Sequence, residues 1–187
     1  MMTLYEVLDA FNGRKATSEE QLRNMFEEIA KVALYGGYFC INKTVKIYPR
    51  DIEFYFYDER SDKYAWARDY NMYHRGKEKD VPYFPLLSLN PHNSGVDVTF
   101  ENEKEQYRAS FLIRAYRYVD DEYDEVYDQP LYLRENMFAY CSCQNGLFIE
   151  WVDEPESGER VLDKATRVNF HDKEGNLDMK LWRFIRK

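Results

Sequence analysis

The sequence is poor in the residues that most often reveal chemistry or cell compartment. It has three cysteines and three histidines in 187 residues. A small, odd number of cysteines argues against a disulfide framework. The isolated pair Cys141 and Cys143 lacks the second cysteine or histidine pair that a zinc site needs, and both fit better as small core or strand residues. We therefore expect no metal, no cofactor and a cytoplasmic protein.

Long apolar runs and common catalytic motifs are also missing. No run approaches the roughly 18 residues that cross a bilayer, and the first residues have neither the basic region nor the apolar stretch of a signal peptide. The chain has no glycine-rich phosphate loop, no G-x-S-x-G turn and no H-E-x-x-H helix. The sequence therefore predicts no membrane association and excludes the commonest motif-defined enzyme classes.

Acidic residues outnumber basic residues, and most of the excess lies in one part of the chain. The 26 basic and 34 acidic residues give a formal net charge of −8, which disfavours a nucleic-acid partner. Residues 120–160 hold 12 acidic and two basic residues, so the rest of the chain is close to neutral. The acidity belongs largely to one region, and a mildly basic stretch from His74 to Lys79 keeps DNA as a candidate partner. The oligomeric state cannot be predicted from the sequence.

The chain does contain enough apolar residues for one domain over residues 1–187. Its hydrophobic fraction is 44% and its aromatic fraction 17%, which is typical of a folded protein. Residues 3–11 are predicted to form a short helix that begins with a Thr3–Glu6 capping box. Helical spacing of apolar residues predicts a longer helix from about Ser18 to Tyr35, ended by Gly36 and Gly37.

After the second helix the apolar period changes to two, which predicts strands. Residues 58–94 are predicted to be irregular, and 120–129 an acidic loop. Two helices followed by many strands indicate an α+β fold, with N-terminal helices before a curved, mostly antiparallel, barrel-like sheet. The strands are expected at 38–41, 44–48, 51–57, 95–101, 107–119, 131–140, 146–152, 165–170 and 180–185.

The strand 51–57 is the most informative for function. Alternation puts Glu53 and Tyr55 on its polar face, about 7 Å apart. A carboxylate beside an aromatic ring suits a pocket that stacks a flat ligand and activates a water molecule. The spacing alone fits a solvated surface strand better, so both interpretations stay open.

Arg114 lies in a strand that is otherwise largely apolar. Alternation puts it on one face with Leu112 and Tyr116, where an unpaired guanidinium would be costly. It is expected either to pair with a core acid such as Asp97 or to orient an anionic ligand. His74 is a candidate ligand contact or a solvated loop residue, and His92 is assigned only to a turn.

Five segments resemble those of a known family in order and spacing. They are IAKVALYGGYF (29–39), DIEFY (51–55), ASFLIRAY (109–116), TRVNF (166–170) and LWRFI (181–185). They resemble the patterns LA..LLGK.L, the second half of IVETEAY, AVLIRAL, SPRIGI and PWRFY of the alkyladenine (3-methyladenine) DNA glycosylase family. The resemblance spans nearly the whole chain and implies the fold of that family.

The resemblance also implies roles for individual residues. Glu53 would be the general base that activates water, and Tyr55 a wall that stacks the flipped base. His74 would contact the nucleotide, Arg114 would lie near the catalytic water, and Asp97 would occupy the place of a pocket asparagine. The implied activity is hydrolysis of the N-glycosidic bond of a damaged base, as in DNA base excision repair, with DNA as partner.

The family's second aromatic segment, Y-V-Y…Y-G-M, is not preserved here. The corresponding stretch is FPLLSLNP at 84–91, and the basic R-G-R-T-P-R-N stretch is reduced to RGKEK at 75–79. The alternative hypothesis is therefore a non-enzymatic module or inactive paralogue that binds a flat small ligand or a protein through a Tyr-rich pocket.

Overall fold

The N-terminal helices form as the sequence predicts. The computed structural model describes residues 2–60, 64–72, 81–140, 146–171 and 175–187. Helix α1 (Leu4–Asp9) begins with the Thr3–Glu6 capping box, and α2 (Glu19–Tyr35) is capped by the Ser18 side chain and ends at Gly36. Both caps satisfy backbone N–H groups that have no partner inside the helix.

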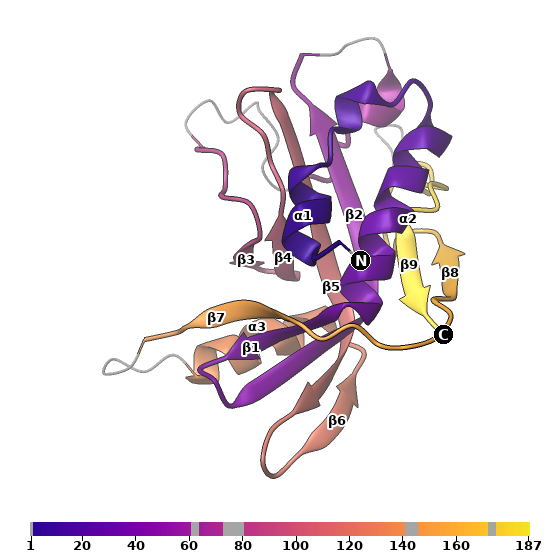
Figure 1. Ribbon diagram of the computed structural model, residues 1–187. Coiled ribbons are helices and arrows are strands. Elements are labelled where there is room, and N and C mark those ends of the chain that lie inside the picture. Colours follow the sequence, from indigo (N-terminus) through magenta and orange to yellow (C-terminus); the bar gives the residue numbers. More distant parts are fainter. Residues whose placement is uncertain (1, 61–63, 73–80, 141–145, 172–174) are drawn as a thin grey trace.

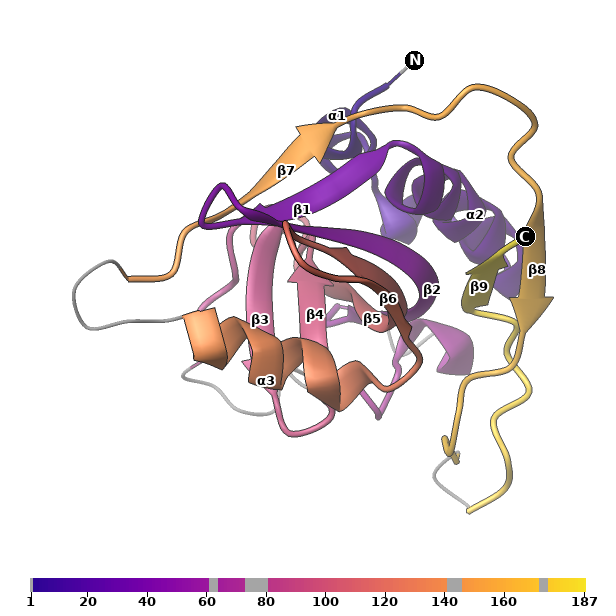
Figure 2. The same cartoon turned by 90° about the horizontal axis from the view of Figure 1, so that it is seen from below.

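The strands that follow form one curled antiparallel sheet, which confirms the predicted fold class (Figures 1 and 2). Along the main path the order is β3-β4-β5-β2-β1-β7. In addition β6 pairs with β5, and β9 pairs with β2 and β8. The strands are β1 (Gly37–Ile41), β2 (Val45–Asp58), β3 (Ser88–His92), β4 (Gly95–Thr99), β5 (Tyr107–Val119), β6 (Asp124–Tyr127), β7 (Ile149–Asp153), β8 (Leu162–Ala165) and β9 (Arg183–Arg186).

Two long strands, β2 and β5, form the centre of the sheet, and α2 covers one of their faces. Phe54 stacks on Phe26 of α2 with ring centroids 4.5 Å apart. Trp182 packs edge-on against Phe26 at 5.3 Å. These rings belong to the main hydrophobic core, which contains most buried apolar residues of the described chain.

The opposite face of β2 is buried as well. Tyr55, Tyr57, Met72 and Leu112 form a second, smaller cluster, with Phe170 packed against it. The interpretation of this face as a solvated surface is therefore wrong. Alternation assigns residues to faces correctly, but it does not reveal that residues from 64–72 and 166–170 cover the polar face.

Four segments differ from the sequence-based expectation. Residues 130–140 form helix α3 rather than a strand, because Pro130 suits a first helical turn and Leu133 and Met137 bury one face. The acidic stretch contains β6, which pairs with the end of β5. The region expected to be irregular contains the short helix η2 (Ala65–Ala67) and β3. The strand expected at 165–170 is wrong, because β8 ends at Ala165.

Two opposed bulges interrupt the β2–β5 ladder. Ile52 pairs with Ile113, Asp51 with Ala115, and Pro49 with Tyr116. Arg114 and Arg50 are therefore the extra residues of their strands, and the alternation of β5 is broken at Arg114. Tyr116 consequently lies in the main core, and the expectation that it shares a face with Arg114 is wrong.

No helix in the described part of the chain is long and apolar enough to span a membrane.

Candidate functional site

A buried carboxylate lies on the β2–β5 pair at the bulge. Glu53 is 0% exposed. The Tyr55 hydroxyl donates to its Oε1 at 2.5 Å, and the backbone N–H of Val168 donates to its Oε2 at 3.1 Å. Arg114 Nη1 lies 3.5 Å from the same Oε2. Burial raises the pKa of Glu53 above its ordinary value, although the Tyr55 hydrogen bond and the Arg114 charge oppose this effect.

The bulge explains how Arg114 reaches Glu53. Glu53 pairs with Leu112, and Arg114 is the residue for which β2 has no counterpart. Its side chain therefore stays on the Glu53 side of the sheet, 16% exposed, while the strand continues into the main core. Arg114 therefore pairs with a core acid, as one of the two expectations held, but this acid is Glu53 rather than Asp97.

A cavity of about 110 Å³ lies next to this centre, lined by Tyr55, Asn71, His92, Ser94, Asp97 and Phe170. The Tyr55 and Phe170 rings meet edge-on with centroids 5.4 Å apart. Tyr55 connects the two parts of the site, because its hydroxyl contacts Glu53 while the residue also lines the cavity.

Asp97 and His92 supply polar atoms to the cavity wall. The Ser110 hydroxyl donates to Asp97 Oδ2 at 3.3 Å, and His92 Nε2 lies 3.2 Å from Asp97 Oδ1. The N–H of Ser94 donates to His92 Nδ1 at 3.2 Å. In the neutral ring the proton is therefore on Nε2, on the Asp97 side.

Sequence reasoning missed the position of His92. It assigned this residue only to a turn, although the two-residue turn between His92 and Gly95 fixes the β3–β4 register. That register places Asp97 two residues from the partner of His92. The hairpin signal in the sequence could therefore have revealed this contact.

The segment that carries Val168 is held by a buried arginine. Arg167 forms ion pairs with Asp69 and Asp178, and all three side chains are almost fully buried. Its guanidinium lies 5.2 Å from the Tyr55 ring centroid and 4.9 Å from that of Phe170. Arg167 therefore supports both the residue that donates to Glu53 and the aromatic wall of the cavity. Sequence reasoning matched this motif but gave Arg167 no role.

Three of the five residues singled out from the sequence meet directly, namely Glu53, Tyr55 and Arg114. Asp97 lies on the wall of the adjoining cavity. His74 lies outside the residues that the structure describes, as do Cys141 and Cys143.

The arrangement allows Glu53 to accept a proton as a general base. A carboxylate with a raised pKa is a stronger base than an ordinary glutamate, and the nearby guanidinium stabilises its ionised form. In the described ranges no group of three or more His, Cys, Asp or Glu side chains is placed to hold a metal ion. None of the family models, curated proteins or solved structures compared with this chain matches it.

Proposed function

We propose that this chain hydrolyses the N-glycosidic bond of a damaged base in DNA, in the manner of the 3-methyladenine DNA glycosylases. The observation that supports this proposal is the contact of Glu53 with Arg114 beside a cavity that Tyr55 and Phe170 line. The resemblance assigns Glu53, Arg114 and Tyr55 to the same reaction, and the contact of Arg114 with Glu53 was not required by their positions in the sequence.

In the proposed step, Glu53 removes a proton from water as the water oxygen bonds to C1′ of the sugar. The C1′–N bond breaks, and its electron pair leaves with the base. An electron-poor alkylated base accepts that pair readily, so one positioned general base can suffice. The raised pKa of Glu53 suits this role. Asp97 and His92 would contact the extruded base, and His74 the nucleotide.

Water has to reach Glu53 for this chemistry. Arg114 is the partly exposed member of the centre, whereas Tyr55 is buried and covers Oε1. We therefore place the nucleophilic water on the Arg114 side of the carboxylate, with the base in the cavity on the Tyr55 side. In this arrangement the attacking water and the leaving base approach the sugar from different directions.

The test measures release of hypoxanthine or 3-methyladenine from duplex oligonucleotides. The wild-type chain should release a base, and Glu53→Gln should lower the rate by about 10²–10⁴-fold, as expected for loss of a general base. Glu101→Gln is the matched control, because Glu101 is another buried carboxylate that lies outside the site. No release by the wild-type chain, or equal release by Glu53→Gln, would overturn the proposal.

A second candidate function is binding of a flat ligand without catalysis. The observation that favours it is that Glu53 is 0% exposed and both of its oxygens already accept hydrogen bonds. In this case adenine should raise the melting temperature of the wild-type chain, and Asp97→Ala should abolish that increase, while neither protein releases a base from DNA. If adenine has no effect on the melting temperature, this second candidate is rejected.

A further inference from the structure

A groove of about 540 Å³ lies at the opposite side of the sheet from the Glu53 centre, between the two ends of the main strand path. Residues 86–89 and Pro91 line one side, and Leu147 with residues 149–151 lines the other. Neighbouring side chains in a strand point to opposite faces, so consecutive lining residues mean that the strand edges border the groove. The two edges are those of β3 and β7.

The backbone of β7 is available on the groove side. Asn42 N–H donates to the Phe148 carbonyl, and Glu154 N–H donates to the Gly36 carbonyl. In the antiparallel β1–β7 register this pattern assigns the even-numbered residues of β7 to the bonds with β1. The N–H and C=O groups of Ile149 and Trp151 therefore point away from β1, and within the described residues β7 pairs with no other strand.

β3 is a poorer template for pairing than β7. Its position 91 is a proline, which has no N–H to donate and is typical of protected edge strands. The leucines at 86, 87 and 89 are only partly buried and supply apolar contacts instead. One side of the groove thus offers backbone hydrogen bonds and the other offers aliphatic side chains.

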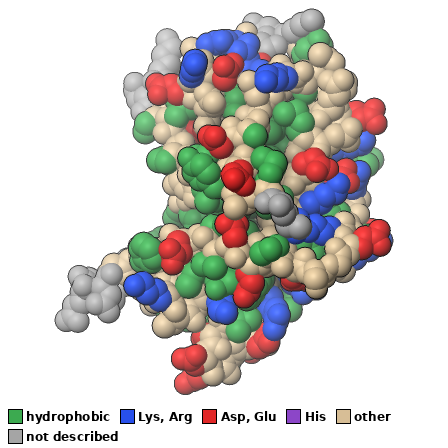
Figure 3. Space-filling model, viewed as in Figure 1, with side chains coloured by type: hydrophobic (Ala, Val, Ile, Leu, Met, Phe, Trp, Pro, Cys, Tyr) green, Lys and Arg blue, Asp and Glu red, His purple; other side chains and the backbone are tan. Residues whose placement is uncertain are grey.

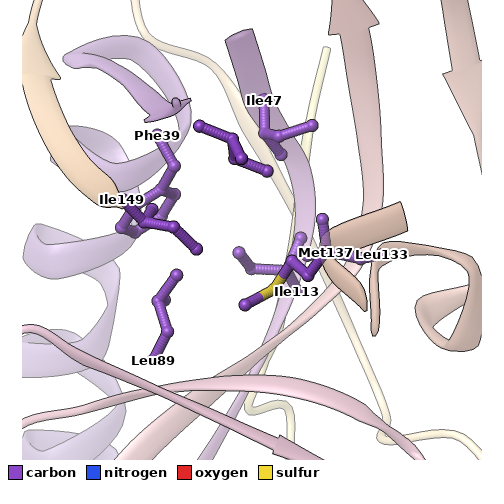
Figure 4. Close-up of a pocket in the computed structure, with 8 residues that line it drawn as sticks. Phe39, Ile47, Leu89, Ile113, Leu133, Met137 and Ile149 are labelled. Carbon is purple, nitrogen blue, oxygen red and sulfur yellow. The ribbon is translucent and has the colours of Figure 1, made fainter. Parts of the chain in front are cut away.

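The floor of the groove deepens into an apolar recess, shown in Figure 4. Phe39, Leu89, Met137 and Ile149 line both the groove and the recess. The lining of the recess consists of apolar residues alone. At the rim, Leu147 and Tyr5 are exposed. An occupant therefore needs aliphatic side chains on the face that it turns to this floor.

The charge around the groove selects the kind of occupant. Glu150 is exposed and is the only charged residue among the described residues that line the groove. In Figure 3 hydrophobic and acidic side chains lie together on this part of the surface, with basic side chains nearby. A second copy of the chain that paired through the same edge would bring its own Glu150 against this one and would be repelled. A strand with lysines or arginines complements Glu150.

We propose that this groove binds an extended, basic segment of another protein, which adds to the free edge of β7 as a further strand. Alternate aliphatic residues of the segment face Phe39 and Met137, and its lysines or arginines lie on the other face, beside Glu150. Main-chain hydrogen bonds to Ile149 and Trp151 fix the register, as in other cases of strand addition.

The test uses a fluorescein-labelled peptide of sequence KLKVKLK and fluorescence anisotropy at 150 mM NaCl. Saturable binding is expected, with a change in tryptophan emission because Trp151 lines the groove. Two control peptides separate the contributions: KSKSKSK keeps the charge without the aliphatic side chains, and KLKVKLK methylated on alternate backbone nitrogens cannot pair along one edge. Both should bind at least tenfold more weakly.

On the protein side, Glu150→Lys should weaken binding at least fivefold. Glu122→Lys makes the same change in net charge on an exposed residue away from the groove and should leave binding unchanged. Equal binding of KSKSKSK, or equal loss in both variants, would show general electrostatic attraction and overturn the proposal. Absence of saturable binding would overturn it too, as would sedimentation of the chain alone as a dimer that Glu150→Lys strengthens.

Discussion

The two faces of the β2–β5 pair are both buried, but one is packed with apolar side chains and the other contains buried charged groups. On the α2 side, Phe54 and Phe111 pack among other aromatic rings, and the packing is almost entirely apolar. On the other side, Glu53, Ser110 and Arg108 are buried together with Tyr55 and Leu112. Apolar burial is favourable in itself, whereas each buried charge needs a matched partner. The first face explains stability, and the second is where a functional site is expected.

The largest loss of stability is expected from a substitution on the apolar face. Phe54→Ala removes a ring that stacks on Phe26 and contacts Phe111 and Phe184. It should lower the free energy of unfolding by about 3–5 kcal/mol, through lost transfer energy and an unfilled cavity. Urea unfolding followed by circular dichroism measures this. A loss below about 1 kcal/mol would mean that packing on this face contributes little to the stability of the fold.

On the charged face, removal of one member of a buried ion pair should lower the free energy of unfolding by a similar amount. Arg167→Met leaves Asp69 buried without its cation and Asp178 with only Lys180 beside it, and should cost about 3–5 kcal/mol in the same unfolding experiment. The triple variant Arg167→Met, Asp69→Asn, Asp178→Asn is the control, because it removes all three charges together. It should recover most of the loss, and failure to recover it would show that shape rather than charge determines this cluster.

A smaller effect is expected from the hydroxyl that touches Glu53. Tyr55→Phe keeps the ring against Phe170 but removes the donor to a buried carboxylate, at a cost of about 1–3 kcal/mol. Because that hydrogen bond lowers the pKa of Glu53, its loss should raise this pKa further. The acid limb of the base-release profile should then move to higher pH. Tyr57→Phe, on the same face but away from Glu53, should leave the profile in place.

The sequence predicts the apolar face more completely than the charged one. Periodicity locates α2 and places Ile52, Phe54 and Phe56 on one side of a strand, because a period in one segment is enough to identify a buried face. The charged face depends on contacts across long separations, such as that of Val168 with Glu53. Its bulge at Arg114 depends on the pairing of two strands, which no single segment encodes.

Local ambiguity explains the other differences from the sequence prediction. Residues 130–140 contain apolar residues at both strand-like and helix-like spacings, and Pro130 together with packing on β4 and β5 favours the helix. The ion pairs of Arg167 join residues up to 98 positions apart, so they could not be inferred from spacing. The motifs at 51–55 and 109–116 lie in β2 and β5 as expected, while the support of the site by Arg167 became visible only in the structure.

A pH dependence of stability is expected at the far end of the charged face. Burial raises the pKa of Glu101 from 4.5 to about 7, although Arg108 and the N–H of Phe84 oppose this effect. Between about pH 4.5 and 7 the folded chain therefore holds a proton that the unfolded chain has already released. Stability must fall as the pH rises through that window, because the folded state then binds more protons than the unfolded state.

Glu101→Gln should flatten this part of the profile, since the amide does not titrate. The comparison is the difference in free energy of unfolding between pH 5 and pH 8, in the wild-type chain and in the variant. Glu53 also has a raised pKa and contributes to the wild-type slope, so only the part lost in Glu101→Gln is assigned to Glu101. An unchanged slope would mean that Glu101 is ionised throughout, with Arg108 fully compensating its burial. The contribution of this end of the charged face to the free energy of unfolding would then be independent of pH, like that of the apolar face.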